Sequence, residues 1–167
     1  MKSVPLIIQA LVQEGVSFVL VGGFAVQMHG FLRATYDLDL VLATDEQNLT
    51  QFIEVCKRFG LMPVAPVPIE SLKNDEQMGR WHKEKGMLAF ALREPNISGS
   101  VIDVLVRPDV SFERLNAEAQ KFNLFNCAVA VASIDHLLEM KRIANRPKDR
   151  IDIEALERIK KGESPDA

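Results

Sequence analysis

The stretch Val21–Ala43, VGGFAVQMHGFLRATYDLDLVLA, has two glycines near its start and two aspartates before its apolar end. Asp37 and Asp39 open a run, Leu38–Leu42, whose composition predicts a short strand. Side chains two positions apart on a strand point the same way, with α-carbons about 6.6 Å apart. At an effective dielectric constant near 20, two carboxylates at that distance repel by about 2.5 kcal/mol. A hard divalent cation removes this repulsion, so the pair indicates a Mg²⁺ site, although aspartates are also common at strand starts.

The glycine pair lies between a predicted strand and a predicted helix. SFVLVGG fits a buried strand that ends at Gly22 and Gly23, and a short helix is expected over Phe24–His29. Glycines at such a turn let backbone N–H groups approach a phosphate at the positive end of a helix. A tight turn without a ligand is the alternative. In the polar loop that follows, Arg33 and Thr35 are placed to meet phosphate oxygens.

A third aspartate interrupts another apolar run. Asp103 lies within SVIDVLV, residues 100–106, which we expect to pair with MLAFAL, residues 87–92, across a turn at EPNISG, residues 94–99. An unpaired carboxylate inside such a strand is costly, so Asp103 requires a partner, such as a shared metal ion or a proton-transfer group. A solvent-facing aspartate on an edge strand is the alternative.

The composition is that of a globular protein. The chain of 167 residues is 47% hydrophobic and 26% charged, which predicts one folded domain over residues 1–167. Its net charge of −3 provides no general attraction to a polyanion. Cys56 and Cys127 form no CxxC pair, so we expect reduced, buried cysteines and a cytoplasmic protein. No stretch has membrane-spanning length, and no membrane association is expected.

The remaining pattern of the first two thirds predicts helices around these strands. Helices are expected over Val4–Glu14, from a capping box at Thr44–Gln47 to about Arg58, and over Ser111–Lys121. The three prolines of MPVAPVPIE, residues 62–70, indicate an edge strand or a linker. GRWHKEKG, residues 79–86, is expected to be a polar loop, with contact to a substrate as the alternative.

A strand and two helices are expected at the C-terminal end. CAVAVA predicts the strand, Ser133 caps the first helix, and Pro147 begins the second. Between Lys141 and Lys161, eight basic residues stand against four acidic ones. This local excess of positive charge fits either a solvated helix face or a surface that contacts phosphates.

Together, VGGFA, YDLDLV and VIDVLV resemble the motifs of the DNA polymerase β-type nucleotidyltransferase superfamily. That pattern has a glycine pair at a strand-to-helix turn, Asp-hydrophobic-Asp on the next strand, and a single aspartate on a third. More narrowly, GGFAVQMHGFLRATYDLDL and the C-terminal VASIDHLLEMKRIANRPKDRIDIEAL resemble the abortive-infection-type nucleotidyltransferase toxins and their small relatives. The resemblance covers both ends of the chain and is weaker in the middle.

The resemblance implies roles for the acids and the glycines. Asp37, Asp39 and Asp103 would hold Mg²⁺ or Mn²⁺, and Asp103 would also help to deprotonate the acceptor hydroxyl. Gly22 and Gly23 would seat the triphosphate of the nucleotide.

The resemblance also assigns two residues of the C-terminal part. Lys141, in EMKRIA, matches the lysine that neutralises nucleotide phosphates in the family, and Asp149, in RPKDRID, matches the family's acidic residue on the following helix. From the residues alone, Lys141 and Asp149 equally fit an ordinary surface ion pair between consecutive helices.

The activity implied by the resemblance is transfer of an NMP group from an NTP to a hydroxyl acceptor. An RNA end such as that of tRNA, a protein side chain and a small molecule all fit as acceptor. The resemblance further implies a toxin of a toxin–antitoxin system, with an antitoxin as partner. A nucleotidyltransferase-like module that has lost catalysis and only binds a nucleotide or a protein is the alternative.

Other site classes fit the sequence less well. DLDLV also matches the Asp-x-Asp-x-Val pattern of haloacid dehalogenase-like phosphatases, but there the acids end a strand and here they begin one. GGFAVQ lacks the GxGxxG spacing of dinucleotide sites, and the three histidines have no zinc-site spacing.

The expected fold class is α+β, with a nucleotidyltransferase-like short mixed sheet and helices packed on one side. The core is expected to cover residues 1–131. A C-terminal helical pair within residues 132–162 is expected to close over a cleft that carries the three acids.

Overall fold

A computed structural model describes residues 4–95 and 101–166 of the chain. Within these residues, seven strands form one sheet in the order β3, β4, β5, β2, β1, β7 and β6. The central strand β2 (Leu38–Leu42) is antiparallel to β1 (Phe18–Val21) and parallel to β5 (Ile102–Leu105). On the far side of β1, β7 (Cys127–Val131) pairs in parallel. The expected α+β fold with a mixed sheet is confirmed.

The outer strands complete the two sides of the sheet. β4 (Ala89–Arg93) pairs antiparallel with β5, as predicted, and β3 (Met62–Pro63) forms the edge beside it. The edge position agrees with the prolines of that segment. The turn predicted between β4 and β5 includes residues 96–100, which lie outside the described residues.

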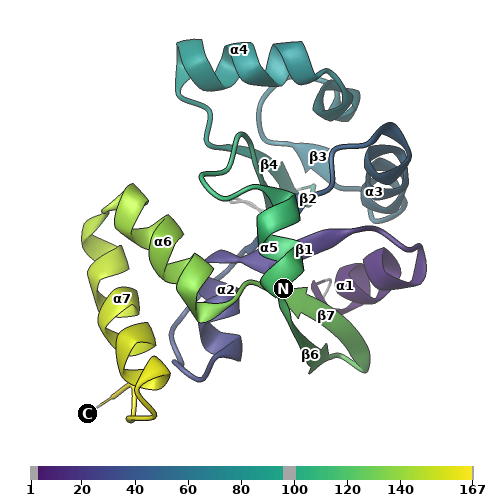
Figure 1. Cartoon of the computed structure of the whole chain (residues 1–167). Coiled ribbons are helices and arrows are strands. Elements are labelled where there is room, and N and C mark those ends of the chain that lie inside the picture. The colour runs from purple at the N-terminus through teal and green to yellow at the C-terminus, as the bar shows by residue number, and fades with distance from the viewer. Residues whose placement is uncertain (1–3, 96–100, 167) are drawn as a thin grey trace.

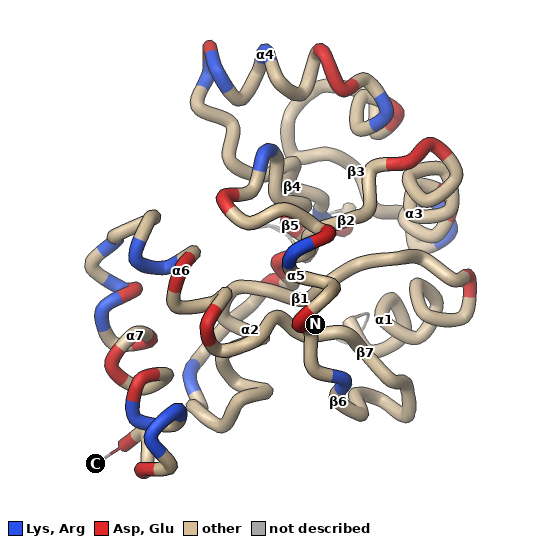
Figure 2. Tube along the Cα trace, in the orientation of Figure 1, with Lys and Arg blue, Asp and Glu red and all other residues tan. Residues whose placement is uncertain are grey.

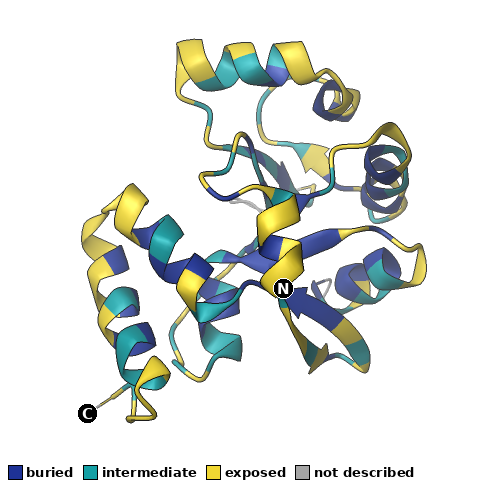
Figure 3. Ribbon diagram, in the orientation of Figure 1, coloured by how far each residue is buried: buried dark blue, intermediate teal, exposed yellow. Residues whose placement is uncertain are grey.

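The alternating direction of side chains along β2 sets the orientation of the site. Leu38, Leu40 and Leu42 point into the core, each at most 4% exposed, so the side chain of Asp39 points to the opposite face. All four residues of β1 are buried. Figure 3 shows the buried residues concentrated along the central strands and on the inner sides of the helices.

Helices surround this sheet (Figure 1). On one side, α1 (Val4–Gln13) contacts α3 (Glu46–Arg58) and β7, with apolar residues of α1 buried at helical spacing. A short α5 (Phe112–Glu118) contacts β1. The other elements between β1 and β4 are α2 (Gly22–Met28), the 3₁₀ turn η1 (Ile69–Lys73) and α4 (Asp75–Lys85).

The C-terminal helical pair forms as expected. The hydroxyl of Ser133 accepts a hydrogen bond from the His136 N–H at the start of α6 (Ile134–Ala144), and Pro147 is the first residue of α7 (Pro147–Lys160). The two helices lie side by side, and α6 contacts α2 (Figure 1). Among the described helices, none has both the length and the apolar character required to cross a bilayer.

Two predictions in the middle of the chain are wrong. GRWHKEKG is helical and forms most of α4, because Asn74 caps its start and Gly86 ends it in the left-handed conformation. The helix expected over Ser111–Lys121 ends at Glu118, and the chain continues as β6 (Gln120–Leu124), which pairs antiparallel with β7.

Smaller corrections concern helix starts and one cysteine. α3 is capped by Asp45, whose carboxylate accepts from the Asn48 N–H, so the predicted capping box at Thr44 does not form. α2 begins at Gly22 rather than at Phe24. Cys127 is half-buried, whereas Cys56 is buried as expected.

Candidate active site

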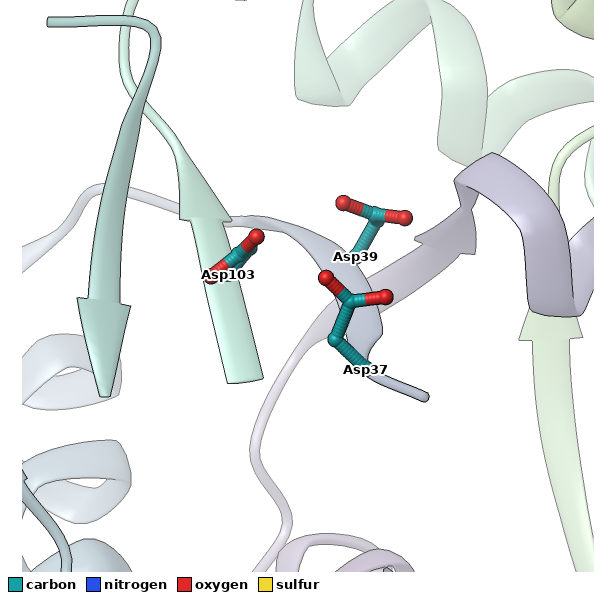
Figure 4. A group of neighbouring side chains, drawn as sticks. All are labelled: Asp37, Asp39 and Asp103. Carbon is teal, nitrogen blue, oxygen red and sulfur yellow. The ribbon is translucent and has the colours of Figure 1, made fainter. Parts of the chain in front are cut away.

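Three carboxylates, two on neighbouring strands and one just before β2, converge on one face of the sheet. Asp39 on β2 and Asp103 on β5 are direct neighbours in the parallel register, so their side chains point the same way. Asp37 lies two residues before Asp39 and shares its face. One oxygen of each side chain lies within 4.8 Å of the others, and all three residues are half-buried (Figure 4). The structure therefore brings the predicted acids together.

The environment of Asp39 disfavours its charged form. Burial, followed by the charges of Asp37 and Asp103, raises the pKa of Asp39 from 3.8 to about 7. A hydrogen bond from the backbone of Gly23 and the charge of Lys141 act in the opposite direction. The nearby cations therefore do not fully offset the repulsion among the three carboxylates. A bound cation would reduce that repulsion.

The glycine pair is required by close approach to the site. Gly22 has φ +67°, and a Cβ at this position would overlap the carboxylate of Asp39. At Gly23, a Cβ would overlap the guanidinium of Arg33 and approach the hydroxyl of Thr35. The two glycines thus let the side chain of Asp39 and those of Arg33 and Thr35 lie directly against the backbone between β1 and α2.

Lys141 is buried among carboxylates, not on the surface. Its Nζ lies 2.7 Å from an oxygen of Asp152 and 3.5 Å from an oxygen of Asp149. Lys141 is 6% exposed, and the two aspartates are at most 2% exposed. The interpretation of Lys141 and Asp149 as a surface pair is therefore wrong, and the basic residues of this segment are not all on a solvated helix face.

Arg146 provides the second cation for Asp149. Its Nε and backbone N–H lie 2.8 and 3.1 Å from one Asp149 oxygen, and its Nη2 donates to the other. Burial opposes ionisation of Asp149, but these hydrogen bonds and the charge of Lys141 together hold its pKa below the usual value. Asp149 is thus an ionised, buried carboxylate at the start of α7.

All the predicted site residues line one cavity of about 380 Å³. They are Gly22, Gly23, Arg33, Thr35, Asp37, Asp39, Asp103, Lys141 and Asp149. The cavity is also lined by residues that the sequence did not assign individually to the site, including Asp152, Arg146 and Lys148 in or beside α7, and His82, Leu88 and Asp109. Asp152 follows Asp149 by three positions on a helix, a spacing that places both on one side and could have indicated it.

Charge around the cavity is nearly balanced. Its lining includes five cationic and six acidic side chains, namely Arg33, Arg107, Lys141, Arg146 and Lys148 against Asp37, Asp39, Asp103, Asp109, Asp149 and Asp152. Figure 2 shows how basic and acidic residues alternate along α6 and α7 beside the sheet. A polyanion alone gains little from such a lining, so nucleotide binding there requires additional positive charge.

The donor set fits a hard divalent cation. Three carboxylates supply oxygen ligands, and Mg²⁺ is commonly held by one or two carboxylates together with substrate phosphates. Asp37, Asp39 and Asp103 are the residues that would hold it. His29, in contrast, has a packing role, because its ring contacts the Ala132 carbonyl at 2.8 Å and the edge of Phe122.

Comparison with known proteins supports the fold assignment. Neither a scan against protein-family models nor a comparison with curated proteins finds a match. Among solved structures, the chain is similar to an antigenic nucleotidyltransferase-like protein from Paracoccidioides brasiliensis, with a TM-score of 0.56 and 20% sequence identity. The similarity covers 93% of this chain and 73% of that one. This similarity shows that the chain has a nucleotidyltransferase-like fold.

Proposed function

We propose that this protein is a divalent-metal-dependent nucleotidyltransferase that transfers an NMP group from an NTP to a hydroxyl acceptor. The observation that carries the proposal is that one oxygen each of Asp37, Asp39 and Asp103, which all line the cavity, lies within 4.8 Å of the others. The nucleotidyltransferase-like fold of the chain supports the same conclusion independently of the acids.

The reaction needs charge neutralisation more than covalent chemistry. The acceptor oxygen forms a bond to the α-phosphorus. The bond between the α-phosphorus and the oxygen that bridges it to the β-phosphorus breaks, and pyrophosphate leaves. Asp103 takes the proton of the acceptor hydroxyl. Asp37 and Asp39 would hold a divalent cation such as Mg²⁺ or Mn²⁺, which would supply positive charge to neutralise the phosphates.

We assign the triphosphate of the nucleotide to the part of the cavity that Arg33 and Lys141 line, beside Gly22 and Gly23. His82 on α4 and Leu88 before β4 also line the cavity, and we assign the acceptor to their side of it. GRWHKEKG, though helical, thus contributes a residue to the substrate cavity.

Turnover of labelled NTPs tests the proposal. Each of the four α-³²P-labelled NTPs is incubated with total RNA, cell lysate or hydroxyl-bearing small molecules, with Mg²⁺ and with EDTA. We expect label transfer for the wild type with Mg²⁺ and none for Asp39→Asn. Asp45→Asn is the matched control, because asparagine caps a helix as well as aspartate and Asp45 is outside the cavity lining.

Three results would discriminate among the alternatives. Binding of an NTP without any consumption would support a module that only binds nucleotides. Equal transfer by Asp39→Asn and the wild type would reject the assignment of the acids. The identity of the labelled product distinguishes an RNA end from a protein or a small molecule.

We extend the proposal to a toxin role on the basis of the sequence resemblance. Induced expression of the wild type is then expected to arrest growth, whereas Asp39→Asn is not. Growth arrest by both proteins, or by neither, would contradict the toxin role and leave the enzymatic proposal to the labelling experiment.

A further inference from the structure

Asp152 joins two cavity-lining cations that come from opposite ends of the chain. One of its oxygens lies 2.7 Å from Nζ of Lys141 on α6, and the other lies 3.3 Å from Nε of Arg33 in the loop before β2. The side chain of Asp152 is 3% exposed. A buried carboxylate with both oxygens engaged by cations is strongly held, because the two ion pairs together offset the cost of burying its charge.

The other side of Arg33 is equally constrained. Its guanidinium lies in the space that a Cβ of residue 23 would fill, so Gly23 supports one face of the group while Asp152 holds its Nε. The Gln27 amide also donates to the backbone carbonyl of Arg33. The guanidinium of Arg33 is thereby fixed beside the acids although it stands on a segment without regular secondary structure.

The residues around Asp152 have a net positive charge, which favours binding of an anion. Arg33, Lys141 and Arg146 carry three positive charges, whereas Asp149 and Asp152 carry two negative ones. The side chain of Arg33 is 25% exposed, so it can contact a ligand from its fixed position.

From these contacts we propose that Asp152 is a positioning residue that holds Arg33 and Lys141 together for binding the triphosphate of the nucleotide. The inference rests on the proposed function and adds a determinant of polyphosphate affinity on α7. Asp152 acts through the two cations and not through the divalent metal, because its two oxygens are directed at Arg33 and Lys141.

A purely structural link between helices is the competing interpretation, and the chain offers a matched control for it. Glu157 on the same helix pairs with Arg142, the residue after Lys141 on α6, but both of these side chains are exposed. Glu157→Gln removes an ion pair between α6 and α7 without touching the cavity lining. Asp152→Asn removes the charge at the buried position with nearly the same shape.

Calorimetric titration with inorganic tripolyphosphate and Mg²⁺ tests the role without knowledge of the preferred base. We expect Asp152→Asn to bind tripolyphosphate about tenfold more weakly or worse, the scale typical of residues that orient a binding group. Glu157→Gln should bind like the wild type. Affinity for Mn²⁺ alone, measured by electron paramagnetic resonance, should be unchanged in both variants because the three acids are intact.

A second variant keeps the test decisive if Asp152→Asn does not fold. Arg33→Lys preserves the charge and the buried pair between Asp152 and Lys141, but lysine cannot contact Asp152 and cover Gly23 at the same time. We expect it to lose tripolyphosphate affinity and to keep Mn²⁺ affinity.

Each contrary outcome has a separate meaning. If the wild type binds tripolyphosphate and Asp152→Asn or Arg33→Lys binds it equally well, the positioning role is overturned and the proposed function stands. Equal losses of tripolyphosphate and Mn²⁺ affinity would identify a structural role instead. A wild type that binds no tripolyphosphate with Mg²⁺ would overturn the proposed function, and the role of Asp152 with it.

Discussion

Gly23 shows how a missing side chain shapes the site. Gly23→Ala places a methyl group where the Arg33 guanidinium lies, so Arg33 must move. The variant should fold, because position 23 is within α2 and alanine favours a helix. We expect Mg²⁺–tripolyphosphate affinity, measured by calorimetry, to fall about tenfold. Mn²⁺ affinity should remain, and unchanged tripolyphosphate affinity would contradict the placement of Arg33.

Asp39 gives the metal-free protein a defined pH dependence. Its pKa of about 7 lies above the ordinary 3.8, so the folded state retains a proton that the unfolded state has lost between these values. Stability is therefore lost as pH rises through this window, by up to about 4 kcal/mol. In EDTA, Asp39→Asn should be more stable than the wild type at pH 8 and similar to it at pH 4.

Urea unfolding at the two pH values measures this difference. A stability difference between Asp39→Asn and the wild type that does not change from pH 4 to pH 8 would show that burial and the neighbouring acids do not act on Asp39 as described.

Strand alternation made the acids predictable from the sequence. Asp37 and Asp39 share a face because they are two residues apart, and Asp103 joins them through the register between β5 and β2. The contact between Asp152 and Arg33 could not be predicted in the same way. Arg33 is at the other end of the chain, and no local pattern relates a loop to a helix so distant in sequence.

At the level of elements, α4 and β6 lack the periodicity on which sequence reasoning depends. Only Met78 is buried in α4, so no apolar stripe marks it as a helix. The sequence indicates this helix only at its two ends, where Asn74 caps the start and Gly86 ends it in the left-handed conformation. In β6 only Leu124 is buried, and the following turn has positive φ at both Phe125 and Asn126, of which only asparagine is typical there.

The C-terminal helices are held to the rest of the chain by apolar packing as well as by ion pairs. Leu137 on α6 is 1% exposed, whereas Ile151 on α7 is 62% exposed. Leu137→Ala should lower the free energy of unfolding by about 2–5 kcal/mol, because it removes buried methyl groups and leaves a cavity. Ile151→Ala is the control and should change it by less than about 0.5 kcal/mol.

Denaturant titration followed by circular dichroism measures both variants. Equal stability of Leu137→Ala and Ile151→Ala would contradict the packing of α6 against the core.

At the scale of the whole molecule, the fold assembles one site from three parts of the chain. The central strands supply the acids, the glycine turn supplies close backbone approach, and α6 supplies the buried cation Lys141 beside the buried carboxylates of α7. The sheet order places β2 and β5 side by side at the centre, although two α-helices, a 3₁₀ turn and two strands separate them in sequence. Because acids and cations nearly balance, the added charge of a metal ion is what makes the cavity attractive to a nucleotide.

Anomalous diffraction from crystals soaked with Mn²⁺ and a non-hydrolysable NTP locates both the metal ion and the nucleotide. We expect an anomalous peak coordinated by Asp37, Asp39 and Asp103, with nucleotide phosphates reaching towards Arg33 and Lys141. A bound nucleotide elsewhere, or a Mn²⁺ ion held by other residues while these three carboxylates remain without metal, would contradict it.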